Sequence, residues 1–230
     1  MPRRSFLHDY FQAGIVAIIV ALFVRTYLVQ AFQIPSPSMR ESILVGDHVL
    51  VNKFIFAPAA SMAGKDLLPL SQAKRGDIIV FKFPQTPEKD YVKRVIGEPG
   101  DVLKIENGAV FVKRPSDSDF RQLEEPYVRH IDPVDSPDEE HLNNRPPVQV
   151  PAGAYYVLGD NRDDSRDSRD WGFVPQELIR GKVLLVYWSV DPLPPPPENA
   201  PPPGRVEAVW KSASTSFTRT RWDRTFHIIR

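Results

Sequence analysis

A nearly continuous apolar run close to the N-terminus constrains the fold of this chain more than any other feature of its sequence. Residues 11–24 (FQAGIVAIIVALFV) contain a single polar side chain, that of Gln12, and Tyr10 extends the run by one residue. A helix needs about 20 apolar residues to cross the hydrocarbon core of a bilayer, so the run alone is slightly short. Arg25 can keep its charge at the lipid headgroups, which extends the predicted transmembrane span to residues 10–28.

Three interpretations of this run are open, and the sequence favours an uncleaved membrane anchor. Arg3 and Arg4 precede the run, which places residues 1–9 in the cytoplasm by the positive-inside rule. Because no second run of this kind follows, residues 29–230 are then expected on the extracytoplasmic side. The second interpretation is a cleavable signal peptide, since VQA (29–31) has small residues where cleavage would fall. The third is a buried helix of a soluble protein.

The composition excludes several classes of protein. Lysine plus arginine and aspartate plus glutamate both number 29, so the chain has no net positive charge with which to attract nucleic acid. The absence of cysteine excludes disulfides, thiolate metal sites and a cysteine nucleophile. The five histidines show no paired spacing of the kind that binds zinc, and we therefore predict neither a metal nor a cofactor.

The chain after the apolar run is predicted to form a mainly β domain. Short runs rich in Val, Ile, Phe and Tyr, separated by Gly and Pro, are typical of strands. They lie at residues 48–56, 77–83, 91–97, 101–114, 154–160 and 182–190. Asn107 and Gly108 interrupt one of these runs and predict a tight β-hairpin turn. No later stretch of about 10 residues has a strong helical period.

Three segments break the strand pattern. Residues 57–75 are small and polar, and residues 115–150 are acidic and contain prolines, so both are predicted to be variable insertions. Residues 192–203 hold eight prolines, which predicts an extended spacer that is either a solvated loop or a partner-binding segment. The tail at 217–230 mixes aromatic residues with arginines, and a final strand is favoured over a segment at the membrane interface.

A conventional serine–histidine pair has no support in the sequence. There is no G-x-S-x-G motif, and among the five histidines only His48 lies in one of the six strand runs given above. A different candidate is QIPSPSM (33–39), where two prolines impose an extended or turning backbone and Ser36 and Ser38 share a face. Taken alone, the motif is either a linker leaving the membrane or a rigid turn that presents a hydroxyl and a backbone N–H to one substrate atom.

A candidate base lies in YVKRVIGEPGD (91–101). Side chains alternate in a strand, so one of the adjacent cations Lys93 and Arg94 must point to the more apolar face. Burial readily removes the charge of a lysine, and a neutral amine can accept the proton of a serine hydroxyl. The alternative is that both residues are edge-strand charges that deter aggregation.

A third motif, GDNRDDSRDSRDWG (159–172), alternates acidic and basic side chains. A solvated charged loop and an oxygen-ligand cation site are both compatible with this composition. The motif lacks the central glycine and the terminal glutamate of an EF-hand loop. The alternation favours a loop that is braced by hydrogen bonds between aspartates and arginines.

Five segments, in the same order, resemble those of the bacterial type I signal peptidases (leader peptidases), a family of serine–lysine endopeptidases. They are FQIPSPSM (32–39), GDHVLVNK (46–53), KRGDIIVF (74–81), YVKRVIGEPGD (91–101) and GDNRDDSRDSRDWGFVP (159–175). The resemblance covers the apolar run and most of the chain to about residue 190. It implies a β domain of short antiparallel sheets behind one N-terminal transmembrane helix.

The resemblance also implies roles for individual residues. Ser38 matches the family's nucleophile and Lys93 its general base. Ser36 matches the residue whose hydroxyl lines the oxyanion hole together with the Ser38 backbone N–H. The supporting positions are Ser165 and Asp167, which orient the lysine, Arg94 and Arg169, which are structural charges, and Asp160 and Asn161 of the same loop. Pro37 stands where the family often has glycine, and this departure leaves the N–H of Ser38 available.

The implied function is cleavage of N-terminal signal peptides from exported preproteins after small residues, of the Ala-x-Ala type, through an acyl-enzyme on Ser38. The preprotein is expected to bind in an extended conformation. The lipid bilayer is the second expected partner, and the protein-export machinery is a further candidate. The expected location is the bacterial inner (cytoplasmic) membrane, with a single span. Two alternatives are a soluble or secreted serine–lysine protease of the self-cleaving repressor type and a catalytically dead membrane-tethered binding module.

Overall fold

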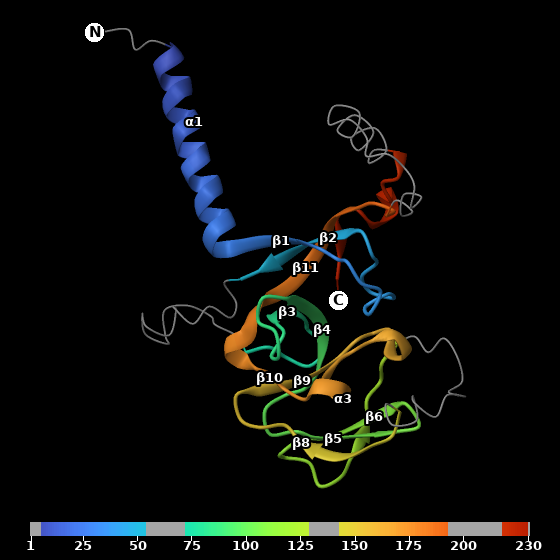
Figure 1. Cartoon of the computed structure of the whole chain (residues 1–230). Helices are drawn as coiled ribbons and strands as arrows, with labels where there is room; N and C mark the ends of the chain where they lie inside the picture. The colour runs from blue at the N-terminus through green and yellow to red at the C-terminus, as the bar shows by residue number, and fades with distance from the viewer. Residues whose placement is uncertain (1–5, 54–71, 129–142, 193–217, 230) are drawn as a thin grey trace.

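The computed structural model describes residues 6–53, 72–128, 143–192 and 218–229, with side chains from residue 10 onward. Most of the predicted insertion at 57–75, the middle of the segment 115–150 and all but the first residue of the segment 192–203 lie outside the described residues. The described chain forms one long helix that stands apart from a β domain (Figure 1).

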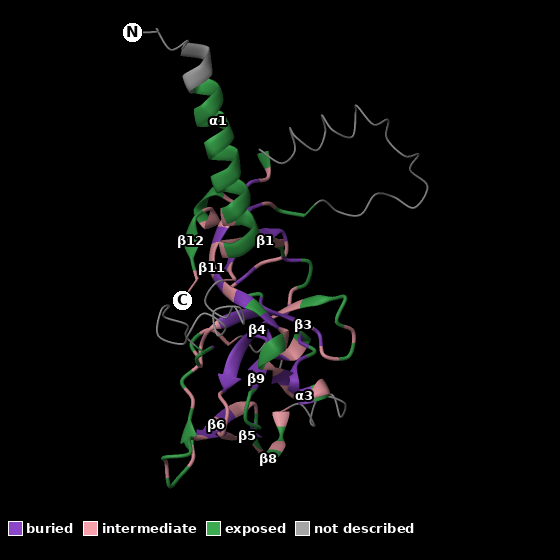
Figure 2. Ribbon diagram, turned by 90° about the vertical axis from the view of Figure 1, so that its left-hand side faces the viewer, coloured by how far each residue is buried: buried purple, intermediate pink, exposed green. Residues whose placement is uncertain are grey.

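The apolar run forms helix α1 (Phe6–Phe23), which continues as a π-helical turn over Val24–Leu28. Figure 2 shows that α1 is exposed along its described length, in contrast to the buried strands of the domain. In the described residues, Tyr10–Leu28 is the one stretch long and apolar enough to cross a membrane. A buried helix of a soluble protein would pack these side chains against the domain, so that interpretation of the run is wrong.

Two antiparallel sheets make up the described part of the domain, which confirms the prediction of a mainly β fold. The first has eight strands in the order β1-β2-β11-β3-β4-β9-β10, with β12 also paired to β11. The second has four strands in the order β7-β6-β5-β8. The bounds are β1 (Val29–Gln33), β2 (Asp47–Asn52), β3 (Ile78–Lys82), β4 (Asp90–Gly97), β5 (Val102–Glu106), β6 (Ala109–Lys113), β7 (Arg121–Gln122), β8 (Arg145–Gln149), β9 (Ala154–Leu158), β10 (Val174–Pro175), β11 (Ile179–Ser189) and β12 (His227–Ile228).

The central strands of the first sheet are buried on both faces. In β3, Ile78 and Val80 belong to one core cluster, whereas Ile79 and Phe81 belong to a second cluster on the opposite face. This is why β3 is apolar without alternation. A third cluster packs β9 and the end of β4 against the second sheet and contains Ile96, Leu103, Ile105, Val110, Val112, Val150, Tyr156 and Leu158. β4 therefore lies where all three clusters meet, and it carries the candidate base.

Two local predictions are confirmed. Asn107 and Gly108 both have positive φ, at 51° and 77°, and they close the β5–β6 hairpin as a primed turn requires. The tail ends in the short strand β12, in which Ile228 pairs with Leu185 of β11.

Four strands of the structure were not predicted, namely β1, β7, β8 and the two-residue strand β10. β1 directly follows the π-helical turn and pairs with β2, although its sequence reads as a continuation of the apolar run. β7 and β8 lie within the segment 115–150, which the sequence indicated as an insertion. β8 contains Pro146 and Pro147, and it is an edge strand of its sheet, where missing backbone N–H groups are tolerated.

Candidate active site

Ser38 lies in the loop that follows β1, in a segment that is fastened at both ends. Ile34 and Met39 are 4% and 1% exposed and belong to the first core cluster, so they hold the segment between them against the domain. The backbone N–H of Asn161 donates to the Ser38 carbonyl at 3.1 Å, and the Asn161 side chain donates to the Pro37 carbonyl at 3.3 Å. The serine is therefore presented by a rigid turn and not by a loose linker.

The Lys93 amine lies 2.6 Å from the Ser38 hydroxyl oxygen, although the two residues are 55 positions apart in the sequence. Lys93 and its neighbour Arg94 are both buried, at 4% and 1% exposure, so the alternative that they are exposed edge-strand charges is wrong. The Lys93 amine also donates to the Val92 carbonyl at 3.1 Å. A serine hydroxyl and a buried amine are thus within direct proton-transfer distance.

The surroundings of Lys93 favour its neutral form. Burial lowers the pKa of Lys93 from 10.5 to about 8, because an ammonium ion loses its hydration in the protein interior. The carboxylates of Asp167 and Asp160 oppose this lowering of the pKa, and the nearby charge of Arg169 adds to it. With a pKa of about 8, a substantial fraction of the lysine is neutral under mildly alkaline conditions and can accept a proton from a hydroxyl.

Ser38 and Lys93 line a groove with a volume of about 300 Å³. The other residues that line it are Ile34 to Pro37, Met39, Asp90 to Val92, Asp164 and Arg166. The Ser36 hydroxyl oxygen lies 3.5 Å from that of Ser38 on the same wall. The structure therefore brings Ser36, predicted to stabilise the oxyanion, to the same groove as the predicted nucleophile and base.

Residues 159–172, called the catalytic loop below, are organised around the fully buried carboxylate of Asp167. Arg169 binds both oxygens of this carboxylate at 2.9 Å. The Ser165 hydroxyl donates to it at 2.8 Å, and the backbone N–H of Gly159 donates at 3.0 Å. Asp167 also caps the short helix α3 (Ser168–Trp171). The predicted bracing by aspartate–arginine hydrogen bonds is confirmed.

Residues 34–39, which carry Ser38, are called the nucleophile segment below. Gly159 lets the catalytic loop pass directly against this segment. A Cβ at this position would overlap the Ser165 hydroxyl and lie 2.5 Å from the Ser38 carbonyl oxygen. Ser165 and Asp167 are therefore brought to the site as predicted, but within the described residues neither forms a hydrogen bond to Lys93. The charge of Asp167 acts on the lysine by raising its pKa, whereas the Ser165 hydroxyl lies beside Gly159.

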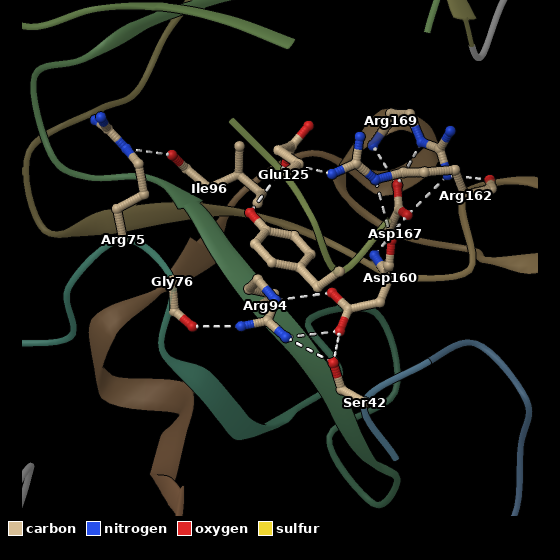
Figure 3. Close-up of polar contacts among 12 residues, drawn as sticks. Ser42, Arg75, Gly76, Arg94, Ile96, Glu125, Asp160, Arg162, Asp167 and Arg169 are labelled. Atoms are coloured by element: carbon tan, nitrogen blue, oxygen red, sulfur yellow. Dashed lines mark hydrogen bonds and ion pairs between the residues drawn. The ribbon is translucent and has the colours of Figure 1, made fainter. Parts of the chain in front are cut away.

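Arg94, which follows Lys93 on β4, forms a second buried ion pair with Asp160 (Figure 3). Arg94 donates to the two carboxylate oxygens of Asp160 at 2.8 and 2.7 Å and to the Gly76 carbonyl at 2.8 Å. The Ser42 hydroxyl donates to Asp160 at 2.5 Å and accepts from Arg94 at 2.8 Å. Ser42 was not predicted from the sequence, because it is 118 positions from Asp160 and becomes its neighbour only in the folded chain.

A serine hydroxyl in contact with a buried lysine amine, in a groove of an antiparallel β domain, is the geometry of a serine–lysine hydrolase. The comparisons with known proteins specify the family. Residues 7–188 match the family model described as signal peptidase, peptidase S26. The chain belongs to this family.

Named relatives agree with the family match. Signal peptidase I of Pseudomonas fluorescens is 32% identical over 213 residues, which cover 82% of this chain and 75% of the relative. Signal peptidase I of Aquifex aeolicus (strain VF5) is 33% identical over 218 residues, which cover 75% of this chain and 80% of the relative. A crystal structure of a signal peptidase I from Enterococcus faecalis V583 has 30% sequence identity and a TM-score of 0.38, and the match covers 49% of this chain and 97% of that chain.

The family match confirms the resemblance that the five sequence segments indicated, and with it the prediction that the chain is a serine endopeptidase. It also decides between the proteases considered from the sequence, because it favours a signal peptidase over a protease of the self-cleaving repressor type.

Proposed function

We propose that this chain is a membrane-anchored signal peptidase in which Ser38 is the nucleophile and Lys93 is the general base. The observation that carries this assignment is the distance of 2.6 Å between the Lys93 amine and the Ser38 hydroxyl oxygen within the groove. The lowered pKa of Lys93 supports it, because a base must be neutral when it accepts the hydroxyl proton. Intact Ser38 and Lys93 also argue against a catalytically dead binding module.

The reaction follows from these positions. Neutral Lys93 accepts the Ser38 proton as the serine oxygen attacks the scissile carbonyl carbon. The Ser36 hydroxyl and the Ser38 backbone N–H stabilise the resulting oxyanion, an effect worth on the order of 3 kcal/mol for each donor. The tetrahedral intermediate collapses, the leaving amine takes the proton from Lys93, and an ester to Ser38 remains. Water, deprotonated by Lys93, hydrolyses the ester and releases the signal peptide with a free carboxylate.

The Ser38–Lys93 dyad is supported by four residues that do not enter the reaction, namely Arg94, Arg169, Ser165 and Asp167. The Arg94–Asp160 pair stiffens the end of β4 next to the base, and the Arg169–Asp167 pair stiffens the catalytic loop. Ser165 fills the space between that loop and the nucleophile segment. The expected consequence is that all four residues tune the rate through the geometry of the site.

The substrate is an extended preprotein segment with small residues before the cleaved bond. In the described strands, residues Asp90 to Lys93 of β4 pair with β3 alone, whereas β9 pairs with β4 only from Arg94 onward. The edge of residues 90–93 that faces away from β3 borders the groove. An extended peptide can add to this edge as a further strand. The apolar side chains of Ile34 and Met39 help to line the groove and limit the size of the residues it accepts.

The membrane is the second proposed partner, with α1 as a single-span anchor, residues 1–9 in the cytoplasm and the β domain outside. Cleavage after Ala31 would cut through β1, where Ala31 pairs with Leu50, so a retained anchor is favoured over a cleaved signal peptide. The tail supports a bilayer-facing surface at the end of the domain from which α1 emerges (Figures 1 and 2). There Trp222, Phe226 and Ile228 are 60–74% exposed.

In a water-facing segment, charged side chains point outward and apolar side chains point inward. The tail has the reverse arrangement. Arg221 and Arg224 turn inward and bind the fully buried carboxylate of Asp47, at 3.3 and 2.8 Å. The large apolar side chains of the same segment are therefore left on the outside. Trp and Phe in this arrangement are typical of segments at a membrane interface, so the interfacial role considered for the tail is compatible with its strand β12.

Cleavage of a preprotein with an Ala-x-Ala site by the full chain in detergent micelles tests the catalytic assignment. Ser38→Ala and Lys93→Met should each reduce kcat by about 1,000-fold or more, since the two residues act as one unit. Ser118→Ala and Lys74→Met change exposed residues of the same types and should leave the rate unchanged. Near-normal cleavage by Ser38→Ala would exclude this serine as the nucleophile.

Mass spectrometry of the membrane-extracted protein tests the anchor. A retained anchor gives the intact mass of 26.1 kDa, whereas cleavage after Ala31 gives a shorter chain. Protease added to sealed membrane vesicles of known orientation should digest the β domain from the extracytoplasmic side only. Digestion from the cytoplasmic side would overturn the proposed orientation.

A further inference from the structure

A loop of the second sheet reaches the buried charges beside the dyad. After β7, the backbone N–H of Leu123 still pairs with the Val110 carbonyl at 2.8 Å, and its side chain packs on the third core cluster. The chain then turns, with the Val128 N–H bonded to the Glu125 carbonyl at 3.1 Å. This turn places Glu125 and Tyr127 against two arginines of the first sheet and the catalytic loop.

Tyr127 covers the guanidinium of Arg94. The centre of the tyrosine ring lies 3.8 Å from Arg94 Cζ, which is the distance of a stacked cation–π contact. The edges of the same guanidinium are occupied by Asp160, Ser42 and the Gly76 carbonyl. The ring therefore closes a face that hydrogen bonds leave open, and it keeps water from the Arg94–Asp160 pair.

Glu125 supplies the carboxylate for Arg162 of the catalytic loop (Figure 3). The two side chains are 9% and 3% exposed, and Arg162 donates to Glu125 at 2.5 Å. Arg162 also donates to the Gly159 carbonyl at 3.1 Å. The Tyr127 hydroxyl donates to Glu125 at 3.1 Å and joins the two contacts. A buried arginine needs such a partner, because an unpaired charge in the interior is strongly unfavourable.

We propose that Glu125 and Tyr127 are positioning residues for the Ser38–Lys93 dyad, an inference that rests on the function proposed above. Arg94 is the neighbour of the base on β4. Its partner Asp160 is followed by Asn161, whose N–H holds the carbonyl of Ser38. One turn of the second sheet thus fixes the strand that carries the base and the loop that holds the nucleophile, and it does so from outside the groove.

The position of the turn predicts a particular kinetic effect. Neither Glu125 nor Tyr127 lines the groove, so their loss should leave substrate binding unchanged. A displacement of the dyad by a fraction of an ångström slows the proton transfer and the attack, since small misplacements of reacting groups reduce rates by up to about 100-fold. The expected signature is a lower kcat at constant KM. A role in stability alone would lower the melting temperature and leave the kcat of the folded enzyme unchanged.

The test compares Glu125→Gln, Tyr127→Leu and Tyr127→Phe in the full chain in detergent micelles, with kcat, KM and Tm measured for each. Glu125→Gln and Tyr127→Leu should lower kcat by roughly 10- to 100-fold with KM unchanged. Tyr127→Phe retains the ring over Arg94 and should stay within about 3-fold of the wild type. Phe120→Leu is the matched control, because the centre of the Phe120 ring lies 5.0 Å from the amine of Lys104 on β5 of the second sheet, and the kcat of this variant should not change.

The outcomes separate this proposal from the function on which it rests. Normal kcat in both Glu125→Gln and Tyr127→Leu, or a change confined to KM or Tm, overturns the positioning role. If Glu125→Gln does not fold, the comparison of Tyr127→Leu with Tyr127→Phe decides the matter alone, since both retain the Glu125 carboxylate. Loss of activity in Ser38→Ala together with unaffected turn variants rejects the inference only. Cleavage that survives Ser38→Ala rejects the proposed function.

Discussion

Replacing Lys93 by methionine should abolish cleavage and at the same time stabilise the folded protein near neutral pH. The lysine has its ordinary pKa of 10.5 in the unfolded chain and a pKa of about 8 in the folded one, because the folded chain buries it. The unfolded chain therefore binds the proton more tightly. Its advantage is complete below about pH 8, and it disappears as the pH rises through 10.5.

The size of the effect follows from the two pKa values. Each unit of pKa corresponds to 1.36 kcal/mol, so burial of Lys93 costs about 3 kcal/mol near pH 7 and about 1 kcal/mol near pH 10. Methionine removes this cost, but it also removes the hydrogen bonds of the amine to Ser38 and to the Val92 carbonyl, each worth about 1 kcal/mol. These bonds change little with pH. The stability difference between variant and wild type should therefore fall by about 2 kcal/mol from pH 7 to pH 10.

Urea unfolding of the full chain in detergent micelles, followed by tryptophan fluorescence at several pH values, measures this difference. The membrane helix is common to both proteins and cancels in the comparison. Lys74→Met, which replaces an exposed lysine, provides the control and should show no pH-dependent difference from the wild type. A Lys93→Met difference that stays flat between pH 7 and pH 10 would refute the account of Lys93 as a base made neutral by burial.

Three further predictions concern the same site. Because Lys93 must be neutral to act, kcat/KM for a fluorogenic peptide should rise with pH and reach half its maximum near pH 8, and a plateau that extends well below this value would contradict the role of the lysine. Gly159→Ala adds a Cβ that overlaps the Ser165 hydroxyl, and we expect a loss of kcat on the order of 100-fold, measured in the same assay. Arg169→Gln leaves Asp167 without its bidentate partner, which raises the pKa of Lys93 and moves the rising limb of the pH–rate profile to higher pH. An unmoved limb in Arg169→Gln would count against this electrostatic role.

The sequence predicted the parts of the site that depend on short motifs. Two prolines and an alternating strand pattern made Ser38 and Lys93 candidates, and the resemblance to the signal peptidases assigned their roles. The alternation of charges in the catalytic loop indicated its internal pairs. The contacts that tie these pieces together were not predictable. Ser42, Glu125 and Tyr127 carry no local signal, because their roles arise from strand pairings and loop approaches between distant positions.

The same difference explains the errors in the fold. The sequences of β3 and β9 can be recognised as strands, because their continuous apolar residues reflect burial on both faces. The sequence of β7 cannot, because the strand has only two residues, and that of β8 cannot, because its prolines are acceptable only at the edge of a sheet. β1 was hidden by the apolar run before it, and its strand character depends on the pairing with β2.

The low pKa of Lys93 depends on the way in which the carboxylates around it are paired. Asp160 and Asp167 would each favour a charged lysine, yet both are bound through two oxygens by an arginine, Arg94 and Arg169. A guanidinium keeps its charge under all conditions that the protein tolerates, so each pair presents little net charge to its surroundings. Desolvation then remains the dominant influence on the lysine. Without the arginines, Lys93 itself would become the counter-ion and would be held protonated, which is the wrong state for a base. A buried lysine base beside two buried aspartates therefore requires two buried arginines, of which Arg169 comes from the loop itself and Arg94 from β4.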